Sequence, residues 1–515
     1  MGHPGGEVVD LIEGFREAGL EFVLTRHEAA AAFMADAMAA ATGIPGACVA
    51  TLGPGATNLV TGVAQAYLDR SPLIAFTGQL PGHRVEIATH QKLDLRALFA
   101  PITKWQARLG PDNAGDVIDR ALRESLRLRR GPVFIEVPSD VPAKVAHDRA
   151  AGYGKRYGGT FPTEALPAIP RDMVQLAAQR LGARARPLIV AGADANDEVT
   201  AARLGAFARE WSIPVIATPK AKGVLREDDP LFLGTIEMLG TAKLYELIDG
   251  CELVLMVGVD PVELDRDWTA TAEVIHIGPL PNDDRYYHAT VEIVGPINEA
   301  IDALRSVCGT GEARWDRDAL ARWRRDFREY VSPPRGRLTA QQVLAELRAA
   351  LPEDALVTCD VGYNKAVTGQ CFPVYRPKTF FMSNGLSSMG YGLPAATGLA
   401  LSHPGRRVAC VLGDGGFGML MGELETAARL GLGVTVVVLV DDALSQIRAG
   451  QERKGYPVTG TTFRTFDYVA LAKGFGVAGH EVSTLDECRI ALRSASAGAP
   501  TLIAARVDAS AYQLG

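Results

Sequence analysis

The chain has 515 residues, which is too many for a single hydrophobic core and suggests about three domains. Apolar residues make up 47%, charged residues 22%, and the formal net charge is −7, so the composition is that of a soluble globular protein with no electrostatic reason to bind nucleic acid. The apolar run 434–440, interrupted only by Thr435, is far shorter than the roughly 20 residues of a membrane span. No secretory signal is present, and seven scattered cysteines show no zinc or disulfide pattern, so we expect a cytoplasmic protein.

Short apolar strands alternate with helical stretches along the whole chain, a pattern that favours parallel sheets with helical crossovers. We predict an α/β protein with three doubly wound domains in series, over residues 1–150, 171–308 and 338–515. The segment 146–170 is interpreted as a linker, and the charged segment 309–337 as a helix plus linker. The predicted strands are 21–24, 47–51, 73–77, 133–137, 187–191, 214–217, 253–257, 273–277, 356–359, 408–412, 434–440 and 501–506.

The densest motif follows a predicted strand in the third domain. Gly413-Asp-Gly-Gly-Phe-Gly418 matches the GxGxxG pattern of dinucleotide folds, so a nicotinamide dehydrogenase is a rival prediction. However, the carboxylate of Asp414 would repel the phosphates of a dinucleotide unless a cation lay between them. Asp414 and Asp441 both end consecutive predicted strands, and Mg²⁺ prefers one or two carboxylates together with phosphate oxygens. We therefore predict a magnesium and diphosphate site at the carboxyl edge of this sheet.

Gly413–Gly415, with Asp441 placed 27 positions after Asp414 (441 − 414), resembles the signature of thiamine-diphosphate enzymes. Similar motifs follow the family's order over nearly the whole chain and are closest to the acetolactate synthase-like branch. These motifs are Arg26–Ala30, Leu52–Asn58, Asp69–Leu73, Thr77–Gln79 and Ser383–Ala396. The resemblance implies a pyrimidine-binding first domain, a central domain and a diphosphate-binding third domain, with thiamine diphosphate and Mg²⁺ as cofactors.

The resemblance also implies a role for each candidate site residue. Glu28 would bond to the pyrimidine ring of the cofactor and let that ring act as a base. Gln91 and His90 would line the substrate side, Met389 would support the bent cofactor, and the backbone of Ser387 would meet its pyrimidine. Taken singly, Glu28 could merely stabilise a helix N-terminus and His90 could be a surface histidine. Diphosphate contacts are expected from Gly362, Tyr363, Asn364, Gly413, Gly415 and Gly416, and metal ligands from Asp414, Asp441 and the carbonyl of Ala443.

The implied activity is that of an acetolactate synthase-like carboligase, which decarboxylates a 2-oxo acid, with pyruvate as the donor, and joins the remainder to a second carbonyl compound. A 2-oxo-acid decarboxylase, a 2-hydroxyacyl-CoA lyase and carboxyethylarginine synthase are alternatives within the family. A non-catalytic cofactor-binding protein is an alternative of another class. In the family the glutamate and the diphosphate site come from different subunits, which implies a homodimer or homotetramer with active sites at the subunit interface.

Three features depart from the family's pattern. The Gly2–Gly6 loop usually follows a helix and a strand, so the first domain is expected to lack its first helix and strand. Gly450 stands near the place where biosynthetic members carry a tryptophan tied to acceptor choice, so a preference for larger acceptors is not expected. Gly258–Leu264 lacks the arginines of flavin-binding members, which makes FAD doubtful as a further cofactor. Lys220 and Lys222 lie in a loop that could face a nucleotide or water.

Overall fold

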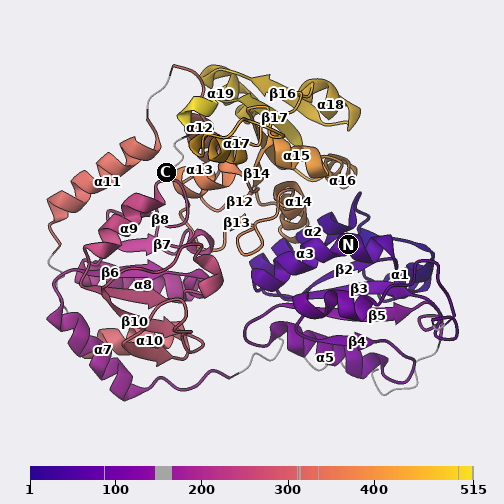
Figure 1. The fold of residues 1–515 in the computed structure, drawn as a ribbon, viewed down its shortest axis with the longest axis horizontal. Helices are drawn as coiled ribbons and strands as arrows, with labels where there is room; N and C mark the ends of the chain where they lie inside the picture. The colour runs from indigo at the N-terminus through magenta and orange to yellow at the C-terminus, as the bar shows by residue number, and fades with distance from the viewer. Residues whose placement is uncertain are drawn as a thin grey trace.

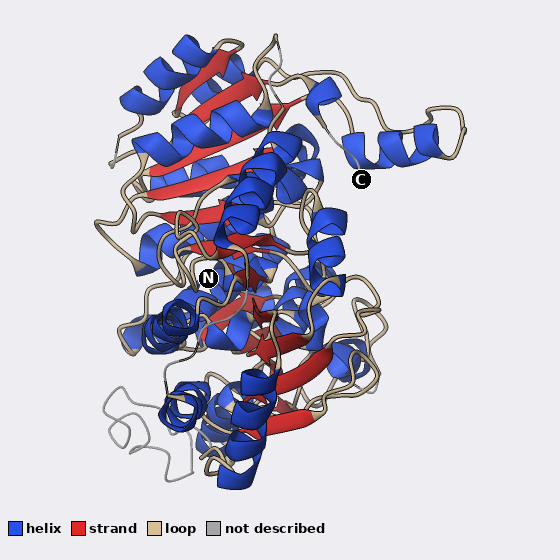
Figure 2. Cartoon of the chain, turned by 90° about the vertical axis from the view of Figure 1, so that its left-hand side faces the viewer, coloured by secondary structure: helices blue, strands red, loops and turns tan. Residues whose placement is uncertain are grey.

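The computed structural model describes residues 1–85, 87–144, 165–309, 311, 315–333, 336–496 and 498–512. It contains three parallel sheets in series, with helices between the strands, which confirms the predicted three-domain α/β architecture. Figure 1 shows the three domains as a triangle, with the third at the top, the central one at the left and the first at the right. Figure 2, turned by 90°, shows helices on both sides of the strands.

The first sheet has five strands in the order β1-β2-β3-β5-β4. Its strands are β1 (Gly2–His3), β2 (Gly46–Ala50), β3 (Leu73–Gln79), β4 (Gln106–Arg108) and β5 (Pro132–Pro138). Its helices are α1 (Val9–Glu17), α2 (Glu28–Thr42), α3 (Pro54–Leu68), α4 (Leu95–Phe99) and α5 (Ala114–Leu126). The predicted strand at 21–24 is wrong, because only Leu24 makes a single bridge, to Gly2.

The central sheet has six strands in the order β11-β10-β9-β6-β7-β8. Its strands are β6 (Pro187–Ala191), β7 (Val215–Ala217), β8 (Phe232–Thr235), β9 (Leu253–Val257), β10 (Glu273–Gly278) and β11 (Val291–Val294). Its helices are α7 (Arg171–Ala183), α8 (Glu198–Trp211), α9 (Thr241–Asp249) and α10 (Ile297–Cys308), and α11 (Arg317–Val331) supplies the helix predicted within 309–337. Most of the predicted linker 146–170 lies outside the described residues.

The third sheet has six strands in the order β13-β12-β14-β15-β17-β16. Its strands are β12 (Leu356–Cys359), β13 (Phe380–Met382), β14 (Val408–Gly413), β15 (Val434–Val440), β16 (Ala478–Val482) and β17 (Thr501–Arg506). Its helices are α12 (Ala340–Ala350), α13 (Tyr363–Cys371), α14 (Gly392–Ser402), α15 (Asp414–Leu420), α16 (Glu423–Arg429), α17 (Ser445–Arg453), α18 (Tyr468–Gly474) and α19 (Leu485–Ser494). β14 pairs with β15, with Gly413 opposite Leu439, so these two strands end side by side.

Helix α2 joins the first domain to the third. Its alanine-rich sequence is buried on almost every side, because small side chains let the helix pack closely against both α3 and α14. Phe33 meets Tyr391 edge to face with ring centroids 5.6 Å apart, and both belong to a core cluster shared with the third sheet. The seven cysteines are free thiols. None of the described helices has both the length and the apolar composition needed to cross a membrane.

Candidate functional site

The two predicted acidic metal ligands lie at the ends of neighbouring strands, Asp414 after β14 and Asp441 after β15. Asp414 Oδ2 accepts hydrogen bonds from the backbone N–H groups of Asp441 (3.0 Å) and Asp442 (2.7 Å). Burial, and then the charge of Asp441, raise the pKa of Asp414 to about 7, and burial also raises the pKa of Asp441. Two carboxylates with little access to water repel each other, and a divalent cation between them would remove that repulsion.

Asp441 is held in place by its own loop. Ser445 Oγ donates to Asp441 Oδ2 at 2.6 Å, and the N–H of Ala443 donates to Oδ1 at 3.2 Å. No cluster of three or more His, Cys, Asp or Glu side chains suited to a metal occurs in the described part of the chain. A cation here would therefore complete its shell with a backbone carbonyl, as proposed for Ala443, and with ligand oxygens, which suits Mg²⁺.

Neighbouring segments pack so closely against the 413–416 turn that larger side chains there would meet them. A Cβ on Gly413 would lie 3.1 Å from the side-chain oxygen of Asn364, and one on Gly415 would lie 2.8 Å from Leu444 Cδ2. A Cβ on Gly416 would lie 2.6 Å from a carboxylate oxygen of Asp360, closer than real contacts allow. The predicted diphosphate-contacting residues of two strand ends are thus brought together at one edge of the sheet.

Asp360 lies against the glycine-rich turn, and the sequence reasoning gave it no role. It follows β12 directly, is fully buried, and accepts hydrogen bonds from the N–H groups of Val361 (2.6 Å) and Gly390 (2.9 Å). Burial raises its pKa to about 7. Asn364 Nδ2 donates to its carbonyl at 2.7 Å. The signal that could have found it is its position, an Asp at the end of a buried strand, as at Asp414.

The segment predicted to meet the pyrimidine reaches the same edge. Ser387 has a φ of +53°, and its Oγ donates to the carbonyl of Asn384 (2.8 Å) and accepts from Lys365 Nζ (3.0 Å). The terminal carbon of Met389 lies 3.2 Å from the position of a Cβ on Gly415. Gly362, with a φ of +134°, precedes α13 in a backbone conformation that favours glycine, and Tyr363 begins that helix.

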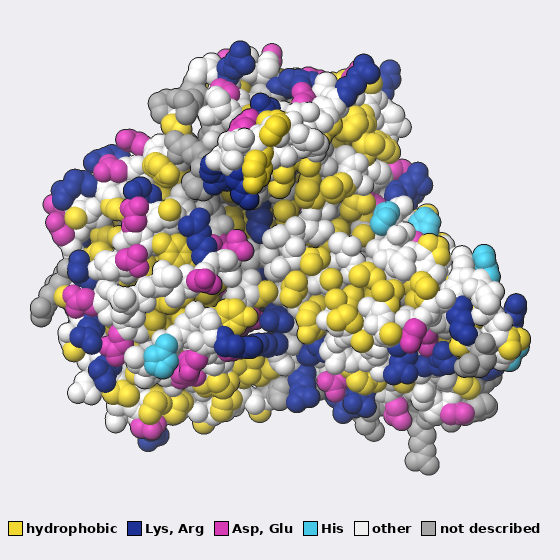
Figure 3. Space-filling model, viewed as in Figure 1, with side chains coloured by type: hydrophobic (Ala, Val, Ile, Leu, Met, Phe, Trp, Pro, Cys, Tyr) yellow, Lys and Arg dark blue, Asp and Glu magenta, His cyan; other side chains and the backbone are white. Residues whose placement is uncertain are grey.

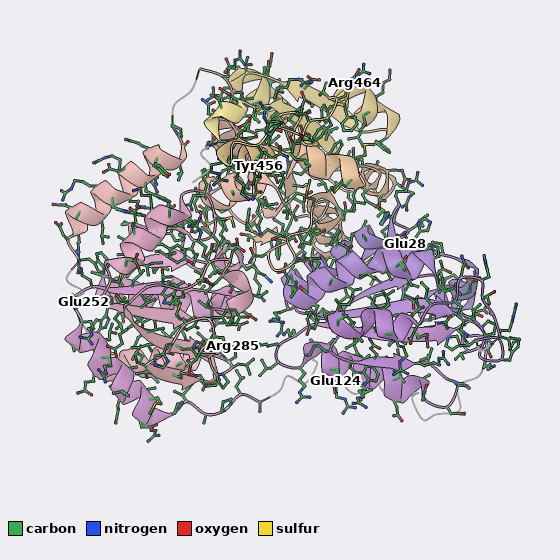
Figure 4. The ribbon with its side chains drawn as sticks, in the orientation of Figure 1. Glu28, Glu124, Glu252, Arg285, Tyr456 and Arg464 are labelled. Carbon is green, nitrogen blue, oxygen red and sulfur yellow. The ribbon has the colours of Figure 1, made fainter. Side chains whose placement is uncertain are left out.

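Glu28 begins α2 and is only 8% exposed. The helix is capped instead by His27, whose Nδ1 accepts from the N–H of Ala29 at 3.1 Å, so capping does not explain Glu28. Asn58 Nδ2 donates to Glu28 Oε2 at 2.9 Å, a partner to which the sequence reasoning gave no role. Figure 4 shows Glu28 at the edge of the first domain that faces the third domain.

Gln91 and Glu28 both approach the start of α3. The side-chain carbons of Gln91 lie 3.2–3.6 Å from the position of a Cβ on Gly53, while Glu28 Oε1 lies 3.4 Å from that of a Cβ on Gly55. Gln91 has a φ of +55°, and His90 beside it is exposed. The first domain therefore gathers its predicted residues around the start of α3.

Glu28 and the acidic pair of the third domain are not directly bonded to each other in the described part of one chain. The hydrogen bond of the Glu28 side chain is made within the first domain, and those of Asp414 are made within the third. No hydrogen bond, ion pair or ring contact among the described residues joins Glu28 to Asp414 or Asp441. Each domain thus carries half of the expected constellation.

Neither lysine of the central loop faces water freely. Lys220 donates to the carbonyl of Asp69 in the first domain at 2.5 Å, and the buried Lys222 pairs with Glu227 at 2.7 Å.

At the carboxyl edge of the central sheet, the side chain of Glu263 occupies backbone N–H groups at the strand ends. The buried Glu263 carboxylate accepts from the N–H groups of Ala193 (2.9 Å) and Asp260 (3.2 Å) and from the hydroxyl of Thr218. Such strand-end N–H groups are those that bind a dinucleotide's phosphates in open α/β sheets, so these residues do not fit the diphosphate of FAD.

Three family models match the chain: the N-terminal TPP binding domain of thiamine pyrophosphate enzymes over residues 1–98, their central domain over 174–304, and their C-terminal TPP binding domain over 360–505. The chain is 30% identical over 504 residues to the acetolactate synthase isozyme 2 large subunit of Escherichia coli, covering 96% of this chain and 89% of that protein. It is 34% identical over 505 residues to the acetolactate synthase of Arthrospira platensis (94% and 86% covered). It is also 33% identical over 509 residues to the probable 2-ketoarginine decarboxylase AruI of Pseudomonas aeruginosa (96% and 88%).

Proposed function

Because the chain belongs to the thiamine pyrophosphate enzymes, in their acetolactate synthase-like branch, we propose that it is a thiamine-diphosphate- and Mg²⁺-dependent carboligase with pyruvate as its donor. The observation that carries the proposal is the pair of carboxylates, Asp414 and Asp441, at adjacent strand ends beside a turn in which a Cβ on Gly415 or Gly416 would lie less than 3.0 Å from a neighbouring side chain. FAD has no part in the proposal, because Glu263 already takes the strand-end N–H groups of the central sheet.

Thiamine diphosphate, when bound, supplies a carbon that adds to a 2-oxo acid and accepts the electrons released with CO₂. Asp414, Asp441 and the carbonyl of Ala443 would hold the Mg²⁺ that neutralises the diphosphate. In the first domain, Glu28 would hold a proton against the pyrimidine nitrogen, and the hydrogen bond from Asn58 keeps its carboxylate oriented. The diphosphate would lie against Gly362, Tyr363, Asn364 and the Gly413–Gly416 turn.

Substrate would enter on the side of the first domain. Gln91 packs against Gly53, two residues before the Gly55 that Glu28 approaches, so its amide could orient the 2-oxo acid beside the reacting carbon. His90 is exposed next to it and could exchange protons with solvent.

The active site is completed between two subunits in this proposal, because no hydrogen bond or ion pair joins Glu28 to Asp414 or Asp441 among the described residues of one chain. Exposed apolar side chains accompany the third-domain half: Met419 is 58% exposed, Ile447 56% and Tyr456 61%. Figure 3 shows apolar side chains spread over the first and third domains on one face of the molecule. A second copy of the chain would cover such a surface and bring its own Glu28.

The deciding experiment measures CO₂ and acetolactate formed from pyruvate in the presence of thiamine diphosphate and Mg²⁺. We expect about one CO₂ for each acetolactate, since two pyruvate molecules yield one of each. Glu28→Gln should keep cofactor affinity and lose at least about a hundredfold in kcat. Acetaldehyde in place of acetolactate would assign a decarboxylase instead, and no CO₂ from cofactor-loaded protein would exclude pyruvate as the donor.

A further inference from the structure

A carboxylate of the third domain holds the backbone that leads into Glu28. Glu423 lies in α16 and is 1% exposed. Its Oε1 accepts hydrogen bonds from the N–H groups of Arg26 (2.9 Å) and His27 (3.1 Å), the two residues before Glu28. Its Oε2 accepts from Thr426 Oγ at 2.7 Å, which fixes the rotamer. The position of Glu28 therefore depends on a side chain almost 400 residues away in the sequence.

A carboxylate of the first domain, that of Asp69, in turn holds backbone N–H groups of the third domain. Asp69 follows α3 directly and is 6% exposed. Its Oδ1 accepts from the N–H of Gly385 at 2.7 Å and its Oδ2 from the N–H of Asn384 at 3.2 Å. These residues lie just before Ser387, in the segment that carries Met389. Here the first domain supplies the carboxylate and the third domain the N–H groups, whereas at Glu423 the third domain supplies the carboxylate.

Neighbouring groups lock the Asp69 contact. Gln65 Nε2 donates to Asp69 Oδ2, and Gln65 Oε1 accepts from Ser383 Oγ at 2.6 Å. Ser383 Oγ in turn accepts from the N–H of Ser388 at 2.8 Å. From the central domain, Lys220 Nζ lies 3.6 Å from Asp69 Oδ1 and balances its charge. All three domains thus meet at this carboxylate.

We propose that Glu423 and Asp69 are reciprocal positioning residues, each holding the cofactor-binding segment of the other domain. Glu423 sets the place of Glu28 against the pyrimidine, and Asp69 sets the place of Ser387 and Met389 beneath the cofactor. The inference rests on the proposed function, which assigns those segments to the cofactor. A displacement of about 1 Å at such segments can lower a rate on the order of a hundredfold.

At Glu423 two substitutions separate positioning from simple loss of a charge. Glu423→Gln keeps an oxygen for both N–H groups and an amide for Thr426 Oγ, so we expect near wild-type behaviour. Glu423→Ala leaves both N–H groups without an acceptor. We expect it to slow hydrogen–deuterium exchange at the cofactor's reactive carbon by about 10- to 100-fold at saturating cofactor. Glu425→Ala is the matched control, because the ion pairs that Glu425 makes among the described residues are with the side chains of Arg26 and Arg429 and not with a backbone N–H group.

At Asp69 the isosteric substitution is the damaging one. Its two oxygens face three N–H donors, from Gly385, Asn384 and Gln65, so Asp69→Asn must place an amide N–H against a donor. We expect the Kd for thiamine diphosphate to rise on the order of tenfold. Asp260→Asn is the control, because Asp260 pairs with Arg70 between the first and central domains.

Amide hydrogen exchange of the unaltered protein checks the same contacts without any variant. We expect strong protection of the N–H groups at 26–27 and 384–385, and rapid exchange there would overturn the inference. Wild-type exchange and cofactor affinity in both Glu423→Ala and Asp69→Asn would also overturn it. In that case cofactor binding by the unaltered protein, together with inactivity of Glu28→Gln, would leave the proposed function standing. Failure of the unaltered protein to bind thiamine diphosphate would overturn both.

Discussion

Asp36 lies in the middle of α2 and is 1% exposed, with Ser71 and Tyr391 close enough to act on the pKa of its carboxyl group. Burial, and then the nearby Asp69, raise its pKa from 3.8 to about 7, against a smaller opposing effect of Lys220. The fold therefore favours the protonated acid. Its contribution to stability is complete below pH 3.8 and is lost as the pH rises from there to about 7.

Asp36→Asn should remove this loss, because an amide does not ionise. We expect the substitution to raise the free energy of unfolding at pH 8 more than at pH 5, by a difference on the order of 2 kcal/mol. Urea unfolding at the two pH values measures the difference. An equal effect of the substitution at both pH values would contradict the assigned pKa, and Asp10→Asn, at the exposed start of α1, serves as the control.

At the scale of elements, the site depends on how β14 turns into α15. The turn runs against Asp360, whose carboxylate is itself fixed by the N–H groups of Val361 and Gly390 and cannot move aside freely. Gly416 is the point of closest approach, whereas a Cβ on Gly418, further along the same helix, would meet only ordinary contacts at 3.6 Å. A larger side chain should therefore be tolerated at Gly418 but not at Gly416.

Gly416→Ala should displace the turn, because its Cβ would lie 2.6 Å from an Asp360 oxygen. We expect a loss of about 1–3 kcal/mol in stability and at least about tenfold in affinity for thiamine diphosphate with Mg²⁺. Gly418→Ala should be neutral or stabilising by up to about 1 kcal/mol, since alanine favours helix. Thermal unfolding and tryptophan fluorescence titration measure both, and similar losses in the two variants would disprove the steric argument.

At the scale of the whole molecule, the question is where a complete active site forms. One chain holds two half-sites, the first around Glu28 and the second around Asp414 and Asp441, on domains that α2 and α14 bind firmly together. Because these helices are buried against each other, a hinge within the chain that closes the half-sites would have to break an apolar core. Pairing with a second copy avoids that cost.

Mixing two inactive variants tests this arrangement. If sites form between subunits, a dimer of one Glu28→Gln chain and one Asp441→Ala chain has one site with both defects and one with neither. Co-expression should then restore about a quarter of wild-type activity, since about half of the dimers are mixed and each has one intact site. Activity that stays at the level of the separate variants would place the complete site within a single chain.

The sequence by itself determined the three α/β domains in series. It also predicted two groups of candidate site residues, one in the first domain and one in the third. Interior strands such as β3 and β15 are buried on both faces, so they appear as continuous apolar runs that can be recognised locally. The strands that were missed lie at sheet edges, where they are short or partly polar: β1, β4, β8, β11, β13 and β16. The closeness of Asp414 and Asp441 could be predicted from the sequence, because the ends of neighbouring parallel strands meet at one edge of a sheet.

Only the tertiary structure decided which groups hold that site in place. Asp69 and Glu423 act on backbone N–H groups 316 and 397 positions away, and a backbone N–H carries no residue-specific signal that a motif could show. Asn58 became the partner of Glu28 only because α3 packs beside α2. Local propensity and strand-end chemistry are encoded in neighbouring residues, whereas the positioning of the site depends on contacts that exist only after the three domains have packed together.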